Sequence, residues 1–480
     1  MGGVPAVVVA APASGSGKTT LATGLIGALR QAGHRVAPFK VGPDYIDPGY
    51  HGLAAGRPGR NLDPVLVGAE RVVPLYHHGA AGCDLAVVEG VMGLFDGRID
   101  EHETGPVAEG STAQVAGLLG APVVLVVDAR GHSQSLAALL HGFATFDSGV
   151  RLGGVILNRV GSERHDQVLR AACARVGLPV LGSLPRMDAL EVPSRHLGLI
   201  PAVEHGAAAA AAVAAMTELV AAHVDLAAVA ALARPAVDGV AWDPVAAVRE
   251  AVAADAAPGS GSNGTVSTDR PGSSGPVIAM AGGPAFTFGY AEHRELLSAA
   301  GARVRVFDPL RDELPTGTAG LVLPGGFPEE HAADLAANTP LLAAVREHAG
   351  AGLPIHAECA GLLYLTRSLD GHAMAGVVDA DAEFGPRLTL GYRDAVALAD
   401  SALWRAGERV RGHEFHRTRL VTAATDAPAW GWHDGAGARV RDGALVGHVH
   451  ASYLHTHPAG NPAATARFFA AAADYARVPH

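Results

Sequence analysis

The sequence predicts an α/β protein with two open, mostly parallel-sheet domains, the first of them a doubly wound P-loop sheet. Two observations predict this fold class. Short apolar runs recur along both halves of the chain, and each is followed by a loop or a helix-length segment. A glycine-rich turn with Lys18 and Thr19 follows the first run, which is the layout of a phosphate-binding strand–loop–helix unit.

The first domain, expected over residues 1–235, is predicted to contain six parallel strands. Their runs are continuously apolar, which is typical of strands buried on both faces. The expected strands are residues 6–10, 35–41, 85–89, 123–128, 154–157 and 180–184. Ligands of such sheets bind beyond the carboxyl ends of the strands, so we expect functional residues directly after each run.

Composition narrows the class of protein. The chain of 480 residues has a formal net charge of −11, which argues against a nucleic-acid partner. Its three cysteines, Cys83, Cys173 and Cys359, are too few and too scattered for a disulfide framework, so we expect a cytoplasmic protein. The first apolar run is too short to span a membrane, and the Ala-rich residues 207–233 are predicted to be helical.

The turn after the first run is the first candidate site. Small residues let backbone N–H groups surround phosphate oxygens, while Lys18 reaches the outer phosphates and Thr19 offers a hydroxyl to Mg²⁺. Pro12 stands where the usual motif has glycine, and a tight turn that merely needs glycine is the alternative. The candidate nucleotide-binding residues are Ser14, Gly15, Ser16, Gly17, Lys18, Thr19 and Thr20.

Acidic residues follow the next two runs. Lys40 lies at the end of the second run and Asp44 and Asp47 follow it, whereas Glu89 and Asp96 come at and after the end of the third. Mg²⁺ prefers hard oxygen ligands, so the Thr19 hydroxyl with Asp47 and Glu89 forms a plausible metal shell. For each single aspartate, a helix cap or a turn is the alternative role.

Asn158 ends the fifth apolar run. In P-loop proteins an asparagine at this strand end often reads the nucleotide base, and a simple turn-forming role is equally compatible with the spacing. We therefore expect Asn158 to be a nucleotide-binding residue.

A linker is expected over residues 236–275, because its later part is rich in Gly, Ser and Pro. The second domain is expected over residues 276–480. Its predicted strands are residues 277–281, 304–307, 321–323 and 354–356.

The second candidate site lies in this domain. Cys359 follows a strand and precedes small residues, a turn that is expected to expose a nucleophile and to lower its thiol pKa at a helix N-terminus. Gly326 ends another strand and can supply an oxyanion N–H, and His455 is the candidate proton carrier. A buried structural cysteine is the alternative. His413 and His416 do not have the zinc spacing of His-Glu-x-x-His, so we do not expect a metal there.

Taken together, these segments resemble the cobyrinic acid a,c-diamide synthase family of cobalamin biosynthesis, including its hydrogenobyrinic acid branch. The N-terminal half is similar to dethiobiotin synthetase, and the C-terminal half resembles a class I glutamine amidotransferase. The similar motifs occur in the family's order at residues 13–20, 39–48, 88–97, 357–362, 411–416 and 451–457. Triad amidotransferases usually carry Glu two residues after the histidine; here that residue is His457, which leaves open what orients His455.

The resemblance implies an enzyme that uses ATP, Mg²⁺ and glutamine to amidate the a and c carboxylates of a corrinoid. Thr19, Asp47 and Glu89 would hold Mg²⁺, and Lys40, Asp44 and Asp96 would face the reacting carboxylate or phosphate. In the second domain Cys359 would attack glutamine, Gly326 N–H would stabilise the oxyanion and His455 would move the proton. Ammonia is expected to pass internally between the domains, and a homodimer is compatible with the sequence.

Three alternatives remain open. A sister amidase could act on another tetrapyrrole, such as a nickel sirohydrochlorin or a cobyric acid-stage ring. A P-loop ATPase switch is disfavoured, because the chain lacks the second loop lysine and carries the cysteine turn. A fusion with an inactive glutaminase half is disfavoured by the presence of Cys359 and His455.

Overall fold

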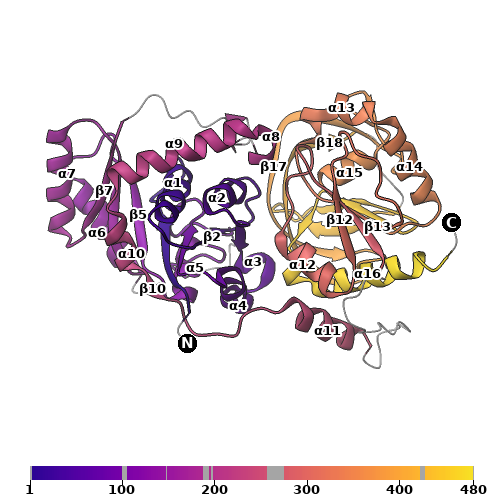
Figure 1. Cartoon of the computed structure of the whole chain (residues 1–480), viewed down its shortest axis with the longest axis horizontal. Helices are drawn as coiled ribbons and strands as arrows, with labels where there is room; N and C mark the ends of the chain where they lie inside the picture. The colour runs from indigo at the N-terminus through magenta and orange to yellow at the C-terminus, as the bar shows by residue number, and fades with distance from the viewer. Residues whose placement is uncertain are drawn as a thin grey trace. The chain divides into compact units, whose positions relative to one another are not determined.

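The computed structural model describes residues 3–99, 105–147, 149–186, 194–195, 198–199, 201–256, 275–421 and 427–478. The chain forms two compact units, Met1–Trp242 and Asp243–His480, which are described separately below (Figure 1). The Gly/Ser-rich part of the expected linker lies outside the described residues.

The first unit is built on one eight-stranded sheet of order β3-β2-β4-β1-β5-β6-β7, in which the neighbouring strands are parallel and β10 pairs antiparallel with β1. Strand β1 lies between β4 and β5, where the order of the sheet reverses, so ligands are expected at its carboxyl end. The strands are β1 Pro5–Ala10, β2 Val36–Val41, β3 Arg60–Leu62, β4 Leu85–Glu89, β5 Val123–Asp128, β6 Leu152–Val160, β7 Val180–Pro185 and β10 Arg234–Pro235; β8 Ser194–Arg195 and β9 Gly198–Leu199 pair with each other.

Helices connect these strands. Helix α1 packs against α2 and α9, whereas α4 packs against α5 and α6 against α7, as expected when right-handed crossovers run in both directions from β1. The helices are α1 Lys18–Gln31, α2 Asp47–Ala55, α3 Pro64–Val67, α4 Ala69–Ala80, α5 Thr112–Leu119, α6 Leu136–Thr145, α7 Glu163–Arg175, α8 Ala202–His205, α9 Ala207–His223 and α10 Leu226–Leu232.

Helices α1 and α9 approach closely because α1 presents glycines to α9 (Figure 1). A Cβ at Gly24 would lie 2.4 Å from the Met216 carbonyl oxygen, and one at Gly27 would lie 2.1 Å from Thr217 Oγ1. The Ala-rich residues 207–233 thus form the predicted helices, and their small side chains allow α9 to support the helix that follows the glycine-rich loop.

The second unit contains two sheets. The first has the order β12-β11-β13-β14-β22-β21 and is parallel except for its antiparallel edge strand β21. The second has the order β16-β15-β17-β18-β23, with β19 pairing β17 and β20 pairing β19. The strands are β11 Val277–Ala281, β12 Arg303–Phe307, β13 Thr318–Leu323, β14 Ile355–Glu358, β15 Ser368–Leu369, β16 His372–Ala373, β17 Asp381–Ala397, β18 Arg409–Leu420, β19 Trp430–His433, β20 Arg439–Asp442, β21 Ala444–Val446, β22 Val449–Ser452 and β23 His455–Thr456.

Among the described residues of this unit, apolar side chains form two separate cores. One includes Leu321, Ile355 and Leu363, and the other includes Ile278, Val322 and Phe468. Because Leu321 and Val322 are neighbours on one strand, the two cores lie on opposite faces of the parallel sheet. The helices are α11 Pro244–Asp255, α12 Ala291–Ala299, η1 Pro328–His331, α13 Ala332–Ala337, α14 Thr339–Gly350, α15 Ala360–Leu365, η2 Pro458–Gly460 and α16 Pro462–Tyr475.

Part of the expected linker is ordered helix. Helix α11 falls inside residues 236–275 and packs against α12 and α16 of the second unit. Asp255 on α11 forms an ion pair with Arg467 on α16, at 2.5 Å between Oδ2 and Nε. This helix was not predicted from the sequence, although Asp243, which accepts from Val245 N–H, is a favoured cap and is followed by Pro244 and an Ala-rich segment.

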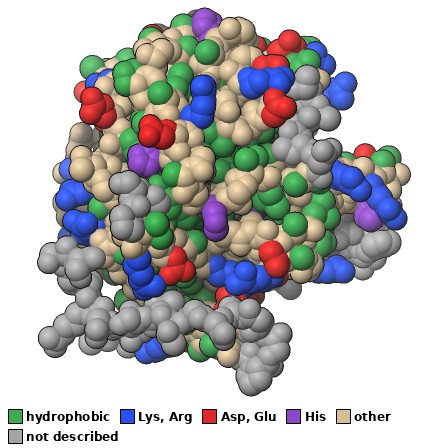
Figure 2. All heavy atoms as spheres, turned by 90° about the vertical axis from the view of Figure 1, so that its right-hand side faces the viewer, with side chains coloured by type: hydrophobic (Ala, Val, Ile, Leu, Met, Phe, Trp, Pro, Cys, Tyr) green, Lys and Arg blue, Asp and Glu red, His purple; other side chains and the backbone are tan. Residues whose placement is uncertain are grey.

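The ten expected strands are confirmed, with bounds that differ by up to three residues at an end. The antiparallel sheet of the second unit was not predicted. On the face drawn in Figure 2, basic and acidic side chains are interspersed, and neither sign forms a large patch. Within the described part of the chain, no helix has both the length and the apolarity needed to cross a membrane.

Candidate active sites

The loop between β1 and α1 has the geometry of a phosphate cradle. Gly15 and Gly17 have positive φ angles of 80° and 93°, a backbone conformation that glycine adopts without strain. Ser16 Oγ closes the loop by donating to the Ala13 carbonyl at 2.9 Å. A Cβ at Gly17 would lie 2.3 Å from Asn158 Nδ2, so glycine is also required by space.

Two consecutive residues near the end of β6 hold this loop. Asn158 Nδ2 donates to the Ser16 carbonyl, and Arg159 Nη1 donates to the Gly15 carbonyl, both at 2.9 Å. In a trans peptide the N–H points opposite to the C=O, so the Ser16 and Gly17 N–H groups face away from β6 and can meet a phosphate. Asn158 was expected to bind the nucleotide base. In this structure its side-chain amide nitrogen is hydrogen-bonded to the loop.

Lys18 extends from the first turn of α1 to the loop after β4. Its Nζ donates to the Met92 carbonyl at 2.5 Å, and Met92 has an unusual positive φ of 41°. Burial lowers the pKa of Lys18, and the neighbouring Lys40 lowers it further. Of the other predicted loop residues, Ser14 is exposed and Thr20 is half-buried.

Thr19, Lys40, Asp47 and Glu89 converge where β1, β2 and β4 end side by side. Thr19 Oγ1 lies 3.1 Å from Asp47 Oδ2 and 2.7 Å from Glu89 Oε1. Lys40 Nζ donates to the same two oxygens, at 2.6 and 2.9 Å. The three adjacent parallel strands thus bring together residues that are up to seventy positions apart in the sequence.

The electrostatics of this cluster are strongly coupled. Burial alone would lower the pKa of Lys40, but Asp47, Glu89 and Asp44 raise it above its usual value. Burial and the Asp44 carboxylate raise the pKa of Asp47 to about 7. Burial would raise the pKa of Glu89, but Lys40 and His51 hold it below its usual range. The cluster therefore carries a cation and closely spaced acids in a place with little water.

The donor set fits a hard divalent cation. Thr19 Oγ1, Asp47 Oδ2 and Glu89 Oε1 face one another, and Mg²⁺ usually takes one or two carboxylates together with phosphate oxygens. Among the described residues, no three His, Cys, Asp or Glu side chains form a group that could hold a metal. A cation here would therefore depend on the threonine hydroxyl and on a bound phosphate as well.

Asp44 and Asp96 also shape their loops. Asp44 Oδ1 accepts from the N–H groups of Ile46 and Asp47 at 2.9 Å each, while its Oδ2 lies 3.8 Å from Lys40 Nζ. Asp96 Oδ2 accepts from the Gly93 N–H at 2.8 Å. Both carboxylates therefore have the turn-forming role that the sequence allows as the alternative, and Asp44 in addition faces the cluster.

His51 was not among the residues predicted from the sequence. Its Nε2 lies 2.6 Å from Glu89 Oε2, and both side chains are fully buried. The sequence does contain an indication of this role, because His51 is four residues after Asp47 and so lies on the same face of helix α2.

Lys18 and Lys40 are the only lysines in the sequence, in which all other basic side chains apart from histidine are arginine. Both lie in this cluster. The sequence therefore has the compact ammonium group of lysine only beside the glycine-rich loop and the buried acids. Every other position with a permanently charged basic side chain is arginine.

A second site forms at the carboxyl ends of three adjacent parallel strands of the other unit. Gly326 follows β13, Cys359 follows β14 and His455 follows β22, and these strands are neighbours in the sheet. The pairing of Glu358 with Ser452 places the last residues of β14 and β22 side by side. The fold thus gathers the three residues that were expected to act together.

Cys359 occupies a strained turn between β14 and α15, with φ 50° and ψ −100°. It is 2% exposed, and its Sγ lies 3.9 Å from the Phe415 carbonyl oxygen. Burial and the Glu329 carboxylate raise the pKa of the thiol, although the Gly326 and Ala360 N–H groups lower it. The expectation of an exposed thiol with a lowered pKa is therefore wrong for this structure, because loss of water outweighs the N–H groups.

His455 is fully buried, and burial lowers its pKa to about 4 although Glu358 opposes this change. A Cβ at Gly325 would lie 2.2 Å from His455 Cε1, so glycine at this position leaves room for the ring. His457 has a different role, because its Nδ1 accepts from the Ala459 N–H at 3.2 Å and its ring packs on Tyr290 at 4.2 Å between centroids.

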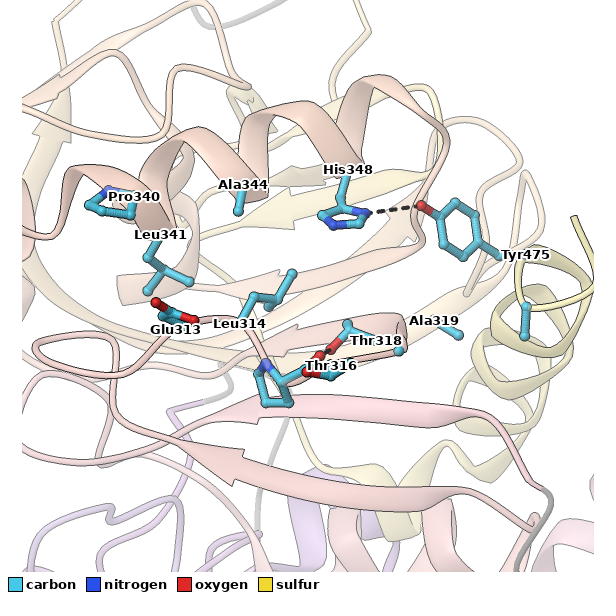
Figure 3. A pocket seen from close by; sticks show the side chains of 13 residues that line it. Glu313, Leu314, Thr316, Thr318, Ala319, Pro340, Leu341, Ala344, His348 and Tyr475 are labelled. Carbon is cyan, nitrogen blue, oxygen red and sulfur yellow. Dashed lines mark hydrogen bonds between the residues drawn. The ribbon is translucent and has the colours of Figure 1, made fainter. Parts of the chain in front are cut away.

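A pocket of about 500 Å³ in the second unit is lined by none of the residues named for either site (Figure 3). Its lining includes Thr318 and Ala319 at the amino end of β13, and His348 and Tyr475, which share a hydrogen bond of 3.2 Å. Cys359 follows the carboxyl end of the neighbouring strand, so this pocket lies at the opposite edge of the sheet.

Comparison with known proteins finds a family match for each half of the chain. Residues 7–200 match the CobQ/CobB/MinD/ParA nucleotide binding domain, and residues 277–463 match the CobB/CobQ-like glutamine amidotransferase domain. A hydrogenobyrinate a,c-diamide synthase of Mycobacterium tuberculosis H37Rv is 61% identical over 98% of each chain. The protein of that name from Streptomyces coelicolor is 57% identical over 97% of each chain. A cobyrinate a,c-diamide synthase of Gloeobacter violaceus is 40% identical over 94% of this chain and 93% of its own.

Identity at this level extends over almost the whole chain and includes both the nucleotide-binding and the amidotransferase segments. The chain belongs to the family of glutamine-dependent a,c-diamide synthases of cobalamin biosynthesis.

Proposed function

We propose that this enzyme converts the a and c carboxylates of hydrogenobyrinic acid, a metal-free corrinoid, to amides, using ATP, Mg²⁺ and glutamine. The observation that carries the proposal is the buried cluster of Lys40, Asp47 and Glu89 beside the glycine-rich loop, in a chain that also holds Cys359 and His455. The relatives that are 61% and 57% identical are named for hydrogenobyrinate, and the one at 40% is named for cobyrinate. This ranking favours the metal-free ring.

In the first unit a substrate carboxylate attacks the γ-phosphorus of ATP, forming an acyl phosphate and releasing ADP. Ammonia then attacks the acyl carbon, and phosphate leaves as the amide forms with loss of a proton. The loop N–H groups and Lys18 hold the phosphates, and Lys40 neutralises charge on the transferred group. Phosphoryl transfer depends mainly on such positioning and charge stabilisation.

Thr19, Asp47 and Glu89 would hold Mg²⁺, which when bound neutralises charge on the ATP phosphates. Asp44 and Asp96 are assigned to the same edge of the sheet, facing the reacting groups. Asn158 is assigned to the nucleotide through the loop that it holds.

In the second unit the Cys359 sulfur attacks the amide carbon of glutamine, and its proton passes through His455 to the departing ammonia. Water then hydrolyses the thioester to glutamate and regenerates the thiol. We assign the Gly326 N–H, which favours the thiolate form of Cys359, to stabilisation of the oxyanion. We place the enzyme in the cytoplasm, and we propose a homodimer.

The test is to incubate the full chain with hydrogenobyrinic acid or cobyrinic acid, ATP, Mg²⁺ and amide-labelled glutamine, and to count labelled nitrogens per ring by mass spectrometry. We expect two on the metal-free ring and few on the cobalt ring. Label on the cobalt ring alone would reverse the choice of ring. Label on neither, with glutamine still hydrolysed, would move the substrate to another acid, such as a nickel sirohydrochlorin or a cobyric acid-stage ring.

The Cys359→Ala variant separates the two chemistries. It should lose glutamine-driven amidation and keep ammonia-driven amidation. Loss of both would contradict the assignment of separate centres for ammonia release and carboxylate activation.

A further inference from the structure

A histidine that carries protons from a thiol needs an acceptor that fixes its tautomer and stabilises its cationic form. The residue two positions beyond His455 is His457, whose Nδ1 accepts from the Ala459 N–H. His457 therefore helps to cap the short helix η2 and cannot supply a negative charge. That charge has to come from an acid elsewhere in the unit.

Glu358 is the acid in contact with the ring. Its Oε2 lies 3.9 Å from His455 Nδ1, and it comes from β14 rather than from the strand that carries the histidine. The distance is that of an ion pair and not of a hydrogen bond, so a short movement of either side chain would close it.

The other oxygen of Glu358 is fixed by neighbours. Oε1 accepts from Thr456 N–H at 3.0 Å and from Thr456 Oγ1 at 2.9 Å, and it lies 3.3 Å from His356 Nε2. Thr456 is the residue next to His455, so the carboxylate and the imidazole are held by the same piece of backbone. This geometry sets the direction in which Oε2 points.

Glu358 stays ionised although it is buried. Burial would raise its pKa, but His356, His455 and the Thr456 N–H lower it to about 2. A negative charge therefore stands beside His455 throughout the neutral pH range.

We propose that Glu358, the residue directly before the nucleophile, is the positioning residue for His455 and stabilises its protonated form while Cys359 reacts. The inference rests on the proposed glutaminase function of the second unit and extends it to a residue with no assigned role. The acid reaches the histidine from the strand of the nucleophile, so cysteine and acid are neighbours in the sequence.

Other charged or titratable groups around His455 come from β18. Glu414 favours its protonated form, whereas His416 disfavours it, and His413 pairs with it across the strands. Glu414 is engaged elsewhere, because Arg393 Nε donates to its Oε2 at 2.6 Å and His416 Nε2 lies 3.4 Å from its Oε1. Glu358 is therefore the stronger candidate, and Glu414 is the competing one.

The test compares Glu358→Gln with Glu414→Gln in the full chain. The substitution Glu358→Gln keeps the shape of the side chain and an oxygen that can accept from Thr456, but it removes the negative charge. We expect the kcat of glutamine hydrolysis to fall by about 100-fold with little change in KM. The acid-side pH midpoint of kcat/KM for glutamine hydrolysis, which reports protonation of His455, should fall, because the imidazolium loses its carboxylate partner.

Ammonia-driven amidation by Glu358→Gln should equal that of the unaltered enzyme, which separates this proposal from the activation chemistry of the first unit. The matched control is His457→Gln, which we expect to leave this pH midpoint unchanged. An unchanged midpoint and kcat in Glu358→Gln would overturn the proposal, as would a shift in Glu414→Gln alone. If Glu358→Gln does not fold, Thr456→Val, which removes one of the bonds to Oε1, should give a smaller shift in the same direction, and no shift would overturn the proposal.

Discussion

His51 Nε2 contacts Glu89 Oε2 at 2.6 Å, while Thr19 and Lys40 contact the other oxygen of the same carboxylate. Glu89 is thus held on both of its oxygens. Its orientation depends on a histidine that comes from helix α2 rather than from the glycine-rich loop. Loss of this histidine should therefore release one side of the carboxylate.

Replacing His51 with Leu should weaken the ATP-dependent step by about 10- to 100-fold, as is usual when a partner that orients a metal-binding carboxylate is lost. The measurement is ADP formation with ammonia as nitrogen donor over a range of Mg²⁺ concentrations. His34→Gln is the control, because His34 is partly exposed and contacts Asp84 away from the cluster. Unchanged Mg²⁺ dependence in His51→Leu would show that His51 does not orient Glu89.

Replacing Lys18 with Ala should abolish amidation from both glutamine and ammonia, because the phosphates lose their ammonium partner. Glutamine hydrolysis should remain in part, since Cys359 belongs to the other unit. Lys18→Arg should also be strongly impaired, because a guanidinium cannot replace the compact ammonium in a buried position. Amide formation from ammonia in Lys18→Ala would mean that the carboxylate is activated elsewhere.

A methyl group at Gly325 should displace His455, since a Cβ there would lie 2.2 Å from the ring. Gly325→Ala is expected to lose glutaminase activity and to keep ammonia-driven amidation. Gly350→Ala, at the end of α14 where a Cβ meets no atom within 4 Å, is the matched control and should retain both. Full glutaminase activity in Gly325→Ala would place the functional histidine elsewhere.

The raised pKa of Asp442 predicts that the unfolding free energy of the chain depends on pH. Burial and the Glu414 carboxylate raise its pKa to about 7, while it accepts from the Tyr453 N–H at 3.1 Å. An acid whose pKa is raised by folding favours the folded state fully at low pH, and this contribution is lost as pH rises through about 4 to 7. The unfolding free energy of Asp442→Asn relative to the unaltered chain should therefore increase between about pH 5 and about pH 8.

The size of that change is about 1 to 3 kcal/mol, because about two pKa units at about 1.4 kcal/mol each separate pH 5 from the folded-state pKa, and partial contact of Asp442 with water favours the lower value. Denaturant unfolding of both proteins at the two pH values measures it. A difference between the proteins that does not vary with pH would contradict the prediction.

The parallel strands could be predicted because burial on both faces requires continuous apolar runs. Strands β4 and β5 begin and end where the sequence predicted, at Leu85–Glu89 and Val123–Asp128. Strand β17 could not be found in this way, because many of its side chains are exposed and its sequence carries Glu383, Arg387 and Arg393. The strands of an antiparallel sheet with one solvated face do not contain continuous apolar runs.

The site residues were predictable where they lie at the end of a strand or directly after it, as Lys40 and Cys359 do. His51 shares a helix face with Asp47, but its contact with Glu89 depends on how α2 packs beside β4 and was not predicted. The sequence shows that Glu358 stands directly before Cys359. It does not show that the Glu358 side chain faces His455, because that contact depends on how the neighbouring strands pack. The burial that raises the Cys359 pKa is a property of the packed unit and cannot be read from a local pattern.

The sequence has only two lysines, and both lie near the expected ATP site, so their side chains can serve as natural spectroscopic probes of that site. Chain grown on isotopically labelled lysine would give two side-chain signals in an NMR spectrum, and both would come from the place where ATP is expected to bind. Amine-directed reagents would meet only these two side chains and the N-terminal amine. Occupancy of the site could therefore be followed in the unmodified enzyme, without engineering a probe into it.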